Sequence, residues 1–199
     1  NYLSALRVAS DDKAADKGIL VVMNDEIHAA KYVTKTHTTN VATFHTPTHG
    51  PLGIIMKHDI LWFKTAEPRV RFDLEQITGT VPIIKAYAGM GIGDGIISLL
   101  DPEKIDGVVI EAMGAGNLPP LAAGEITKLM EKGVPVVLVS RCFNGIAEPV
   151  YAYEGGGVKL QEAGVMFVKE LNAPKARLKL LIALSAGLKG QELKDYIEG

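Results

Sequence analysis

The sequence predicts an α/β protein in two parts, a first part that includes a β-hairpin and a Rossmann-like second part built on a parallel sheet. Three observations predict it. After residue 80, short apolar runs alternate with helix-like stretches, which is the pattern of βαβ units. A polar stretch without clear periodicity precedes them, over residues 65–80. Before that stretch, two apolar runs flank the turn residues His58 and Asp59, as in a hairpin.

The first part, residues 1–64, is expected to hold a helix, a buried strand and the hairpin. Apolar residues recur at helical spacing over 3–16, so this segment is predicted as a helix. The continuous apolar run 19–23 is typical of a strand buried on both faces. The hairpin is predicted to pair residues 52–57 with residues 60–64.

Residues 65–80 are predicted to be an interdomain linker, because they are polar and carry Pro68 and Gly79. Residues 81–199 are predicted to form a Rossmann-like domain with a parallel sheet. Its predicted strands cover residues 81–86, 107–111 and 135–139. Its predicted helices cover residues 94–100, 119–132, 157–164, 173–186 and 190–197.

Composition excludes several classes of function for this chain of 199 residues. Its net charge of −2, with basic residues scattered singly, argues against a nucleic-acid partner. No apolar run reaches the length needed to cross a bilayer, so no membrane partner is expected. The one cysteine, Cys142, excludes an intrachain disulfide framework and is expected to be a buried, inert thiol.

Two motifs suggest metal or nucleotide binding, but the residues around or within them do not support it. His45 and His49 have the spacing of a helical ligand pair, but Pro47 lies between them in a turn, so no metal site is predicted. The glycine-rich loop from Tyr87 to Gly95 does not satisfy G-x-G-x-x-G in any register. No cofactor is therefore predicted.

The most informative segment is the hydroxyl-rich run from Tyr32 to Asn40, in which Lys35 stands between Thr34 and Thr36. A lysine at a strand end can transfer protons when partial burial favours its neutral amine and neighbouring hydroxyls relay the proton. A surface loop whose Thr and Asn side chains hydrogen-bond their own backbone is the other interpretation. The residues alone leave both open.

The residues from Val33 to Gly53 read VTKTHTTNVATFHTPTHGPLG and follow GILVVMNDEIHAAKY. This run resembles the bacterial-type L-asparaginase family, and its secreted type II branch more than the cytosolic type I branch. In that family the lysine of V-T-K-T is the basic partner of a Thr-Lys-Asp triad. The resemblance extends over essentially the whole chain and implies that Lys35 is catalytic, with Thr34 and Thr36 in support.

Two further motifs of that family are not found in this sequence. The family's nucleophilic threonine lies in a glycine-rich loop near its N-terminus, and a Thr-Asp pair follows it. The chain opens at Asn1 inside an expected helix, as though the first part of the protein had been removed or lay on another chain. Residues 1–64 are therefore expected to be the C-terminal part of a larger N-terminal domain, and the chain alone is expected to be inactive.

Two loops of the second domain are candidates for substrate binding, because ligands of open parallel sheets lie beyond the carboxyl ends of the strands. Asn117 resembles the asparagine of the family's G-x-G-N loop, which lies near the substrate; a plain helix cap is the alternative. A family glutamate that reaches the neighbouring protomer's active site corresponds to Glu154, or to Glu148 in a second alignment. A solvated surface glutamate is the ordinary alternative.

The resemblance implies hydrolysis of L-asparagine to L-aspartate and ammonia through an acyl-threonine intermediate, with L-glutamine as a further substrate. The nucleophile would come from an N-terminal segment absent from this chain. The resemblance also implies a homotetramer built as a dimer of dimers, secreted or periplasmic, with a cytoplasmic location still open. Two other functions stay open: a non-catalytic small-molecule-binding α/β module, and an asparaginase-like subunit of the tRNA-dependent amidotransferase.

Overall fold

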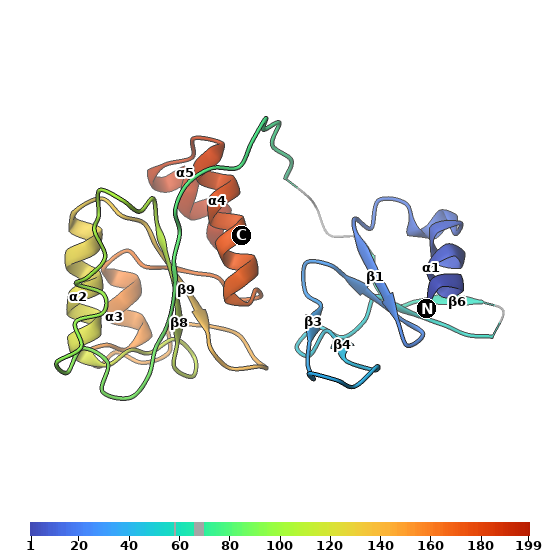
Figure 1. Ribbon diagram of the computed structural model, residues 1–199, viewed down its shortest axis with the longest axis horizontal. Coiled ribbons are helices and arrows are strands. Elements are labelled where there is room, and N and C mark those ends of the chain that lie inside the picture. The colour runs from blue at the N-terminus through green and yellow to red at the C-terminus, as the bar shows by residue number, and fades with distance from the viewer. Residues whose placement is uncertain (58, 66–69) are drawn as a thin grey trace. The chain divides into compact units, whose positions relative to one another are not determined.

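A computed structural model describes residues 1–57, 59–65 and 70–199. The chain divides into two compact units, unit 1 (Asn1–Arg71) and unit 2 (Phe72–Gly199), whose elements are labelled in Figure 1. Unit 1 contains an antiparallel sheet and unit 2 a parallel one, which confirms the predicted α/β fold class. The boundary between the units falls within 65–80, the predicted linker, of which residues 66–69 lie outside the described residues.

The described part of unit 1 is built mainly from short antiparallel strands. Its elements are α1 (Tyr2–Ala9), the 3-10 helix η1 (Asp12–Ala14), β1 (Leu20–Met23), β2 (Glu26–Ala29), β3 (Thr34–Lys35), β4 (Phe44–His45), β5 (Gly53–Ile55) and β6 (Ile60–Trp62). Strands β1, β2, β5 and β6 form one sheet in that order, and β3 and β4 form a separate two-stranded ribbon. The pairing of β5 with β6 confirms the predicted hairpin, although His58 of its turn lies outside the described residues.

Two predictions for unit 1 are wrong. The helix predicted over 3–16 ends at Ala9, because the Asp11 carboxylate accepts the Lys13 N–H at 2.8 Å and starts a 3-10 turn instead. Strand β1 is not buried on both faces; it is half-buried throughout. The reason is its place at the edge of the sheet, where it pairs with β2 alone and the preceding Ile19 is 80% exposed.

Unit 2 is a four-stranded parallel sheet in the order β10-β9-β8-β7. Its elements are β7 (Ile83–Lys85), β8 (Val108–Ala112), α2 (Pro120–Glu131), β9 (Val136–Ser140), α3 (Gly157–Glu162), β10 (Met166–Phe167), α4 (Ala173–Ser185) and α5 (Gly190–Glu198). The three predicted strands and the helices predicted from residue 119 onward are confirmed. The two-residue strand β10 was not predicted, because it is too short to show a period.

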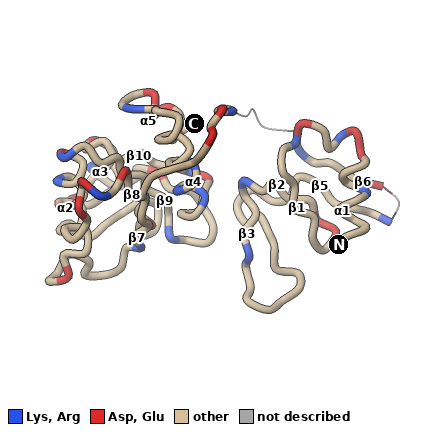
Figure 2. Tube along the Cα trace, turned by 45° about the horizontal axis from the view of Figure 1, so that its top comes forward, with Lys and Arg blue, Asp and Glu red and all other residues tan. Residues whose placement is uncertain are grey.

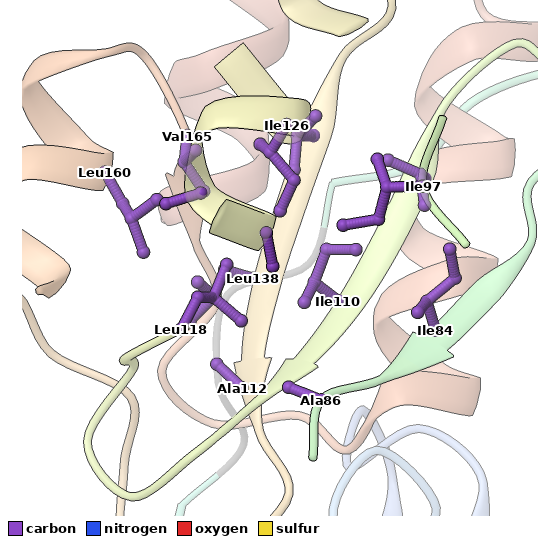
Figure 3. Packing of buried hydrophobic residues seen from close by; sticks show 14 of the residues in the cluster. Ile84, Ala86, Ile97, Ile110, Ala112, Leu118, Ile126, Leu138, Leu160 and Val165 are labelled. Carbon is purple, nitrogen blue, oxygen red and sulfur yellow. The ribbon is translucent and has the colours of Figure 1, made fainter. Parts of the chain in front are cut away.

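Both faces of this sheet are covered by apolar side chains that alternate along the central strands. Val108 and Ile110 of β8 pack with α2 and α3, whereas Val109 between them packs with α4 and α5. On β9, Leu138 joins the first cluster and Val137 the second. Figure 1 shows the two helix layers on opposite faces, and Figure 3 shows the packing of the first cluster. Successive side chains of a strand point to opposite faces of the sheet. Because both faces are buried here, apolar residues follow one another and the strands are continuous apolar runs.

The helix predicted over 94–100 is wrong; turns occupy this segment. Gly95 lies inside this segment with a positive φ, which a right-handed helix does not allow, and Gly89 and Gly91 just before it also have a positive φ. A Cβ at Gly91 would stand 2.8 Å from the Cβ of Leu121 at the start of α2. The loop is therefore shaped by close packing against α2.

Candidate active site

Lys35 lies on the two-residue strand β3, where it stands opposite Phe44 of β4. Its side chain is exposed, and its Nζ lies 5.5 Å from the centroid of the Phe44 ring. The partial burial expected for this lysine is therefore not found within unit 1.

The hydroxyl groups around Lys35 hold the ribbon together through the backbone. The Oγ1 of Thr36 donates to the Thr43 carbonyl at 2.9 Å, and the Thr36 N–H donates to the same oxygen at 2.7 Å. The buried Thr43 Oγ1 accepts the His37 N–H and donates to the His37 carbonyl, both at 2.7 Å. These contacts match the interpretation of the hydroxyl-rich run as a loop whose side chains hydrogen-bond its own backbone. They also stabilise the ribbon that carries Lys35.

A polar cluster on β2 lies against the ribbon. Glu26 and His28 face His45 and the following Thr46, and His28 and Thr46 are buried. Burial lowers the pKa of His28 below its ordinary value, a shift that the nearby Glu26 carboxylate partly opposes. Sequence analysis missed this cluster, because the only available signal was two polar residues alternating on a short strand.

In unit 2, Asn117 closes a tight loop after β8. Its N–H donates to the Met113 carbonyl and its carbonyl accepts the Met113 N–H, both at 2.9 Å. Its side-chain Oδ1 accepts the N–H of Gly157, the first residue of α3, at 3.4 Å. Asn117 therefore contacts α3, whereas α2, the helix that follows it in sequence, has Pro119 as its N-cap and no side-chain cap.

Glu154 is exposed on the turn before α3, and that turn is joined to the Asn117 loop. The Leu118 N–H donates to the Gly155 carbonyl at 2.9 Å, and the Glu148 N–H donates to the Ala115 carbonyl at 2.7 Å. A Cβ at Gly155 would stand 2.3 Å from the Leu118 carbonyl oxygen. The structure thus brings the two predicted loops together, and both Glu154 and Glu148 belong to this junction.

Polar side chains that sequence analysis did not single out also hold the carboxyl ends of the strands. Arg141 Nη1 donates to the Ala86 carbonyl at 2.7 Å, and Ser140 Oγ donates to the Gly114 carbonyl at 2.6 Å. The Tyr87 hydroxyl donates to Asp94 at 2.5 Å, which lowers the pKa of Asp94 and raises the pKa of Tyr87. A polar residue directly after a buried strand is the signal that could have pointed to them.

Cys142 is exposed, so the prediction of a buried thiol is wrong. It follows β9 where the chain leaves the sheet, and its N–H donates to Ser140 Oγ at 3.0 Å. Among the described residues, no three His, Cys, Asp or Glu side chains form a group suited to a metal ion.

Across the described chain, no helix combines the length and the apolar character that a membrane crossing requires. Figure 2 shows acidic and basic residues interspersed along both units.

Two family models match nearly the whole chain. The glutaminase/asparaginase C-terminal domain matches residues 80–197, and the asparaginase N-terminal model matches residues 1–68. The chain belongs to the asparaginase family. The predicted resemblance to bacterial type II-like asparaginases is thereby confirmed.

Individual asparaginases agree with the family models. A probable L-asparaginase of Deinococcus radiodurans is 40% identical over 98% of this chain, and a probable periplasmic L-asparaginase of Haemophilus influenzae is 31% identical over 100% of it. The crystal structure of a probable cytoplasmic L-asparaginase from Campylobacter jejuni matches 99% of the chain with a TM-score of 0.82 at 26% identity. The chain spans only 59%, 56% and 60% of these three asparaginases.

Proposed function

We propose that this chain is the C-terminal part of an enzyme that hydrolyses L-asparagine to L-aspartate and ammonia, with L-glutamine as a further substrate. The observation that carries the proposal is Lys35, which stands in a V-T-K-T segment on an exposed ribbon of a chain that belongs to the asparaginase family. Its exposure leaves the amine accessible to groups outside unit 1.

The proposed chemistry is amide hydrolysis through an acyl-threonine intermediate. A threonine hydroxyl is a weak nucleophile and needs an adjacent base, and Lys35 takes that role, supported by Thr34 and Thr36. The threonine itself comes from a segment outside this chain, and this chain alone is inactive. Preorganised donors to the developing oxyanion belong to the completed site.

Asn117 and Glu154 orient the amino-acid substrate in this proposal. The junction between their loops supports it, since backbone hydrogen bonds and the close approach at Gly155 restrict both loops. Glu154 is exposed, so its carboxylate is available to a substrate ammonium group. Glu148 remains the alternative for the same role.

We further propose that the protein assembles as a homotetramer, a dimer of dimers in which Glu154 completes the site of a neighbouring protomer. A secreted or periplasmic location fits the Haemophilus influenzae relative, which is named periplasmic. The Campylobacter jejuni relative is named cytoplasmic, so the cytoplasm stays as the alternative location.

The test measures ammonia release from L-asparagine by the intact protein that contains this chain, with Lys35→Met against Lys31→Met. Both lysines stand over an aromatic ring, at 5.5 Å for Lys35 and 4.8 Å for Lys31. We expect Lys35→Met to lose about a thousandfold in kcat with an unchanged melting temperature, since it removes a proton-transfer group. Lys31→Met should keep its turnover. Equal turnover in both variants would exclude a catalytic Lys35 and favour a binding module.

A further inference from the structure

The ribbon that carries Lys35 is too small to hold its own position. Strands β3 and β4 have two residues each and form a sheet separate from the four-stranded one. Isolated two-stranded ribbons are marginally stable in water at best. The position of Lys35 therefore depends on what fastens this ribbon to the rest of unit 1.

The contacts that hold the ribbon come from side chains on one face of β2. Glu26 and His28 are two residues apart on that strand, so their side chains point to the same side. His45 Nδ1 lies 3.2 Å from Glu26 Oε2, and His28 Nδ1 lies 3.0 Å from Thr46 Oγ1. Two consecutive residues at the end of the ribbon are thus held by two alternate residues of β2.

Both ring nitrogens of His45 face oxygen atoms that accept hydrogen bonds. Its Nε2 lies 3.0 Å from the Ala42 carbonyl oxygen, which can only accept a hydrogen bond. Its Nδ1 faces the Glu26 carboxylate, which when ionised can also only accept. A doubly protonated His45, whose charge is paired with Glu26, would satisfy both of these acceptors.

His28 completes the cluster in its neutral form. It is fully buried, and burial lowers its pKa, which disfavours a second positive charge beside His45. Its Nε2 lies 3.3 Å from the same Glu26 oxygen, without the geometry of a hydrogen bond. The titratable groups set against His45 are thus Glu26 and His28 from β2, while β3 presents the uncharged Thr34 at the opposite position.

We propose that Glu26 is a positioning residue for Lys35: its carboxylate pairs with the doubly protonated His45 and thereby fixes the β3–β4 ribbon on β2. The importance of this pair for catalysis rests on the proposed function. The pair itself, with side chains 31% and 41% exposed, is a property of unit 1.

The test follows the ring nitrogens and the ribbon amides by NMR in the full 199-residue chain. In the unaltered chain near neutral pH, we expect ¹⁵N shifts that show protons on both nitrogens of His45. In Glu26→Gln, which keeps the shape but removes the charge, we expect only one of them to stay protonated. The Thr36 amide should then exchange about tenfold faster, the usual size for one hydrogen bond to a charged group.

The matched control is Glu111→Gln, which removes a strand carboxylate paired with Lys85 at 3.4 Å in unit 2. It should leave exchange at Thr36 unchanged. A merely structural role of Glu26 is distinguished by the ring nitrogens of His45. A substitution that only loosened the packing would leave both nitrogens protonated in Glu26→Gln.

A singly protonated His45 in the unaltered chain, or unchanged Thr36 exchange in Glu26→Gln, overturns the inference. These readouts do not involve turnover. If Glu26→Gln loosens the ribbon but Lys35→Met keeps its turnover, the proposed function fails and the ion pair stands. If Lys35→Met is inactive while Glu26→Gln changes neither NMR readout, the ion pair fails and the proposed function stands.

Discussion

Unit 2 buries apolar side chains on both faces of its parallel sheet, whereas the described part of unit 1 buries as many polar residues as apolar side chains. The buried apolar side chains of unit 1 are those of Val8, Ile27 and Val33, and its buried polar ones are those of His28, Thr43 and Thr46. All the buried polar side chains found in the described chain lie in unit 1. The candidate base, Lys35, thus stands in the unit with the smaller apolar core.

This difference separates two ways of holding a functional residue. Apolar packing is not directional, so unit 2 positions its loops through the shape of a dense core and close backbone contacts. Hydrogen bonds and ion pairs have fixed geometry and depend on protonation, so unit 1 positions its ribbon in a way that pH can change.

The largest effect on stability is expected when a buried isoleucine is truncated in each unit, which tests whether the two cores differ. Ile110 and Ile27 are both fully buried, one in each unit. We expect Ile110→Ala to lower the free energy of unfolding of unit 2 by about 4 kcal/mol and Ile27→Ala to lower that of unit 1 by about 2 kcal/mol. The measurement is native-state hydrogen exchange, read separately for each unit. Equal losses in both units after either variant would show one cooperative core.

The junction between the Asn117 and Glu154 loops can be tested with a pair of glycines. Gly155 and Gly187 have positive φ angles of 83° and 80°, but a Cβ meets the Leu118 carbonyl only at Gly155. We expect Gly155→Ala to cost about 3 kcal/mol in denaturant unfolding and Gly187→Ala about 1 kcal/mol. The difference between the two losses measures the effect of the close contact at Gly155, because the backbone strain is similar at both glycines. Similar losses would mean that the two loops are not held by this contact.

The two units should also respond differently to acid. The pKa of His28 is lowered by burial from an ordinary value of 6.5, so the unfolded chain binds the proton more readily. The contribution of His28 to the stability of unit 1 should therefore be fully present above pH 6.5 and be lost as the pH drops below it toward the folded-state pKa.

Unit 2 serves as an internal control for this pH dependence, because all five histidines of the chain lie before residue 59. Its lowered carboxylate pKa values, those of Asp94 and Asp101, act only at more acidic pH. Hydrogen exchange between about pH 7 and 5, corrected for intrinsic rates, measures the stability of both units in the same sample. A unit 1 response as flat as that of unit 2 would contradict the role of His28.

The smallest effect is expected from the surface ion pair of unit 2. Lys85 and Glu111 stand 3.4 Å apart on neighbouring strands, and the lysine side chain is 64% exposed. We expect Lys85→Met to change the free energy of unfolding by less than about 1 kcal/mol, an effect that salt should reduce further. Denaturant titration at low and high salt measures it. A larger loss would mean that ion pairs support unit 2 as well.

The elements of unit 2 were predictable because the signal was local and repeated. Val108 to Ile110 and Val136 to Val139 are continuous apolar runs, and each is followed by a helix after turn residues. The failures have local causes too. The first helix ended early where the Asp11 carboxylate accepts the Lys13 N–H, and the positive φ of Gly95 is incompatible with the helix predicted over 94–100.

Local pattern and motif sufficed for the parallel sheet and for the family resemblance, and they single out Lys35 as the candidate base, because each depends on residues adjacent in sequence. The tertiary structure decided the rest. It joined the Asn117 loop to the Glu154 turn, and it set Glu26 against His45. Such contacts join residues distant in the chain, and their geometry follows from how the strands and helices pack, which no local periodicity records.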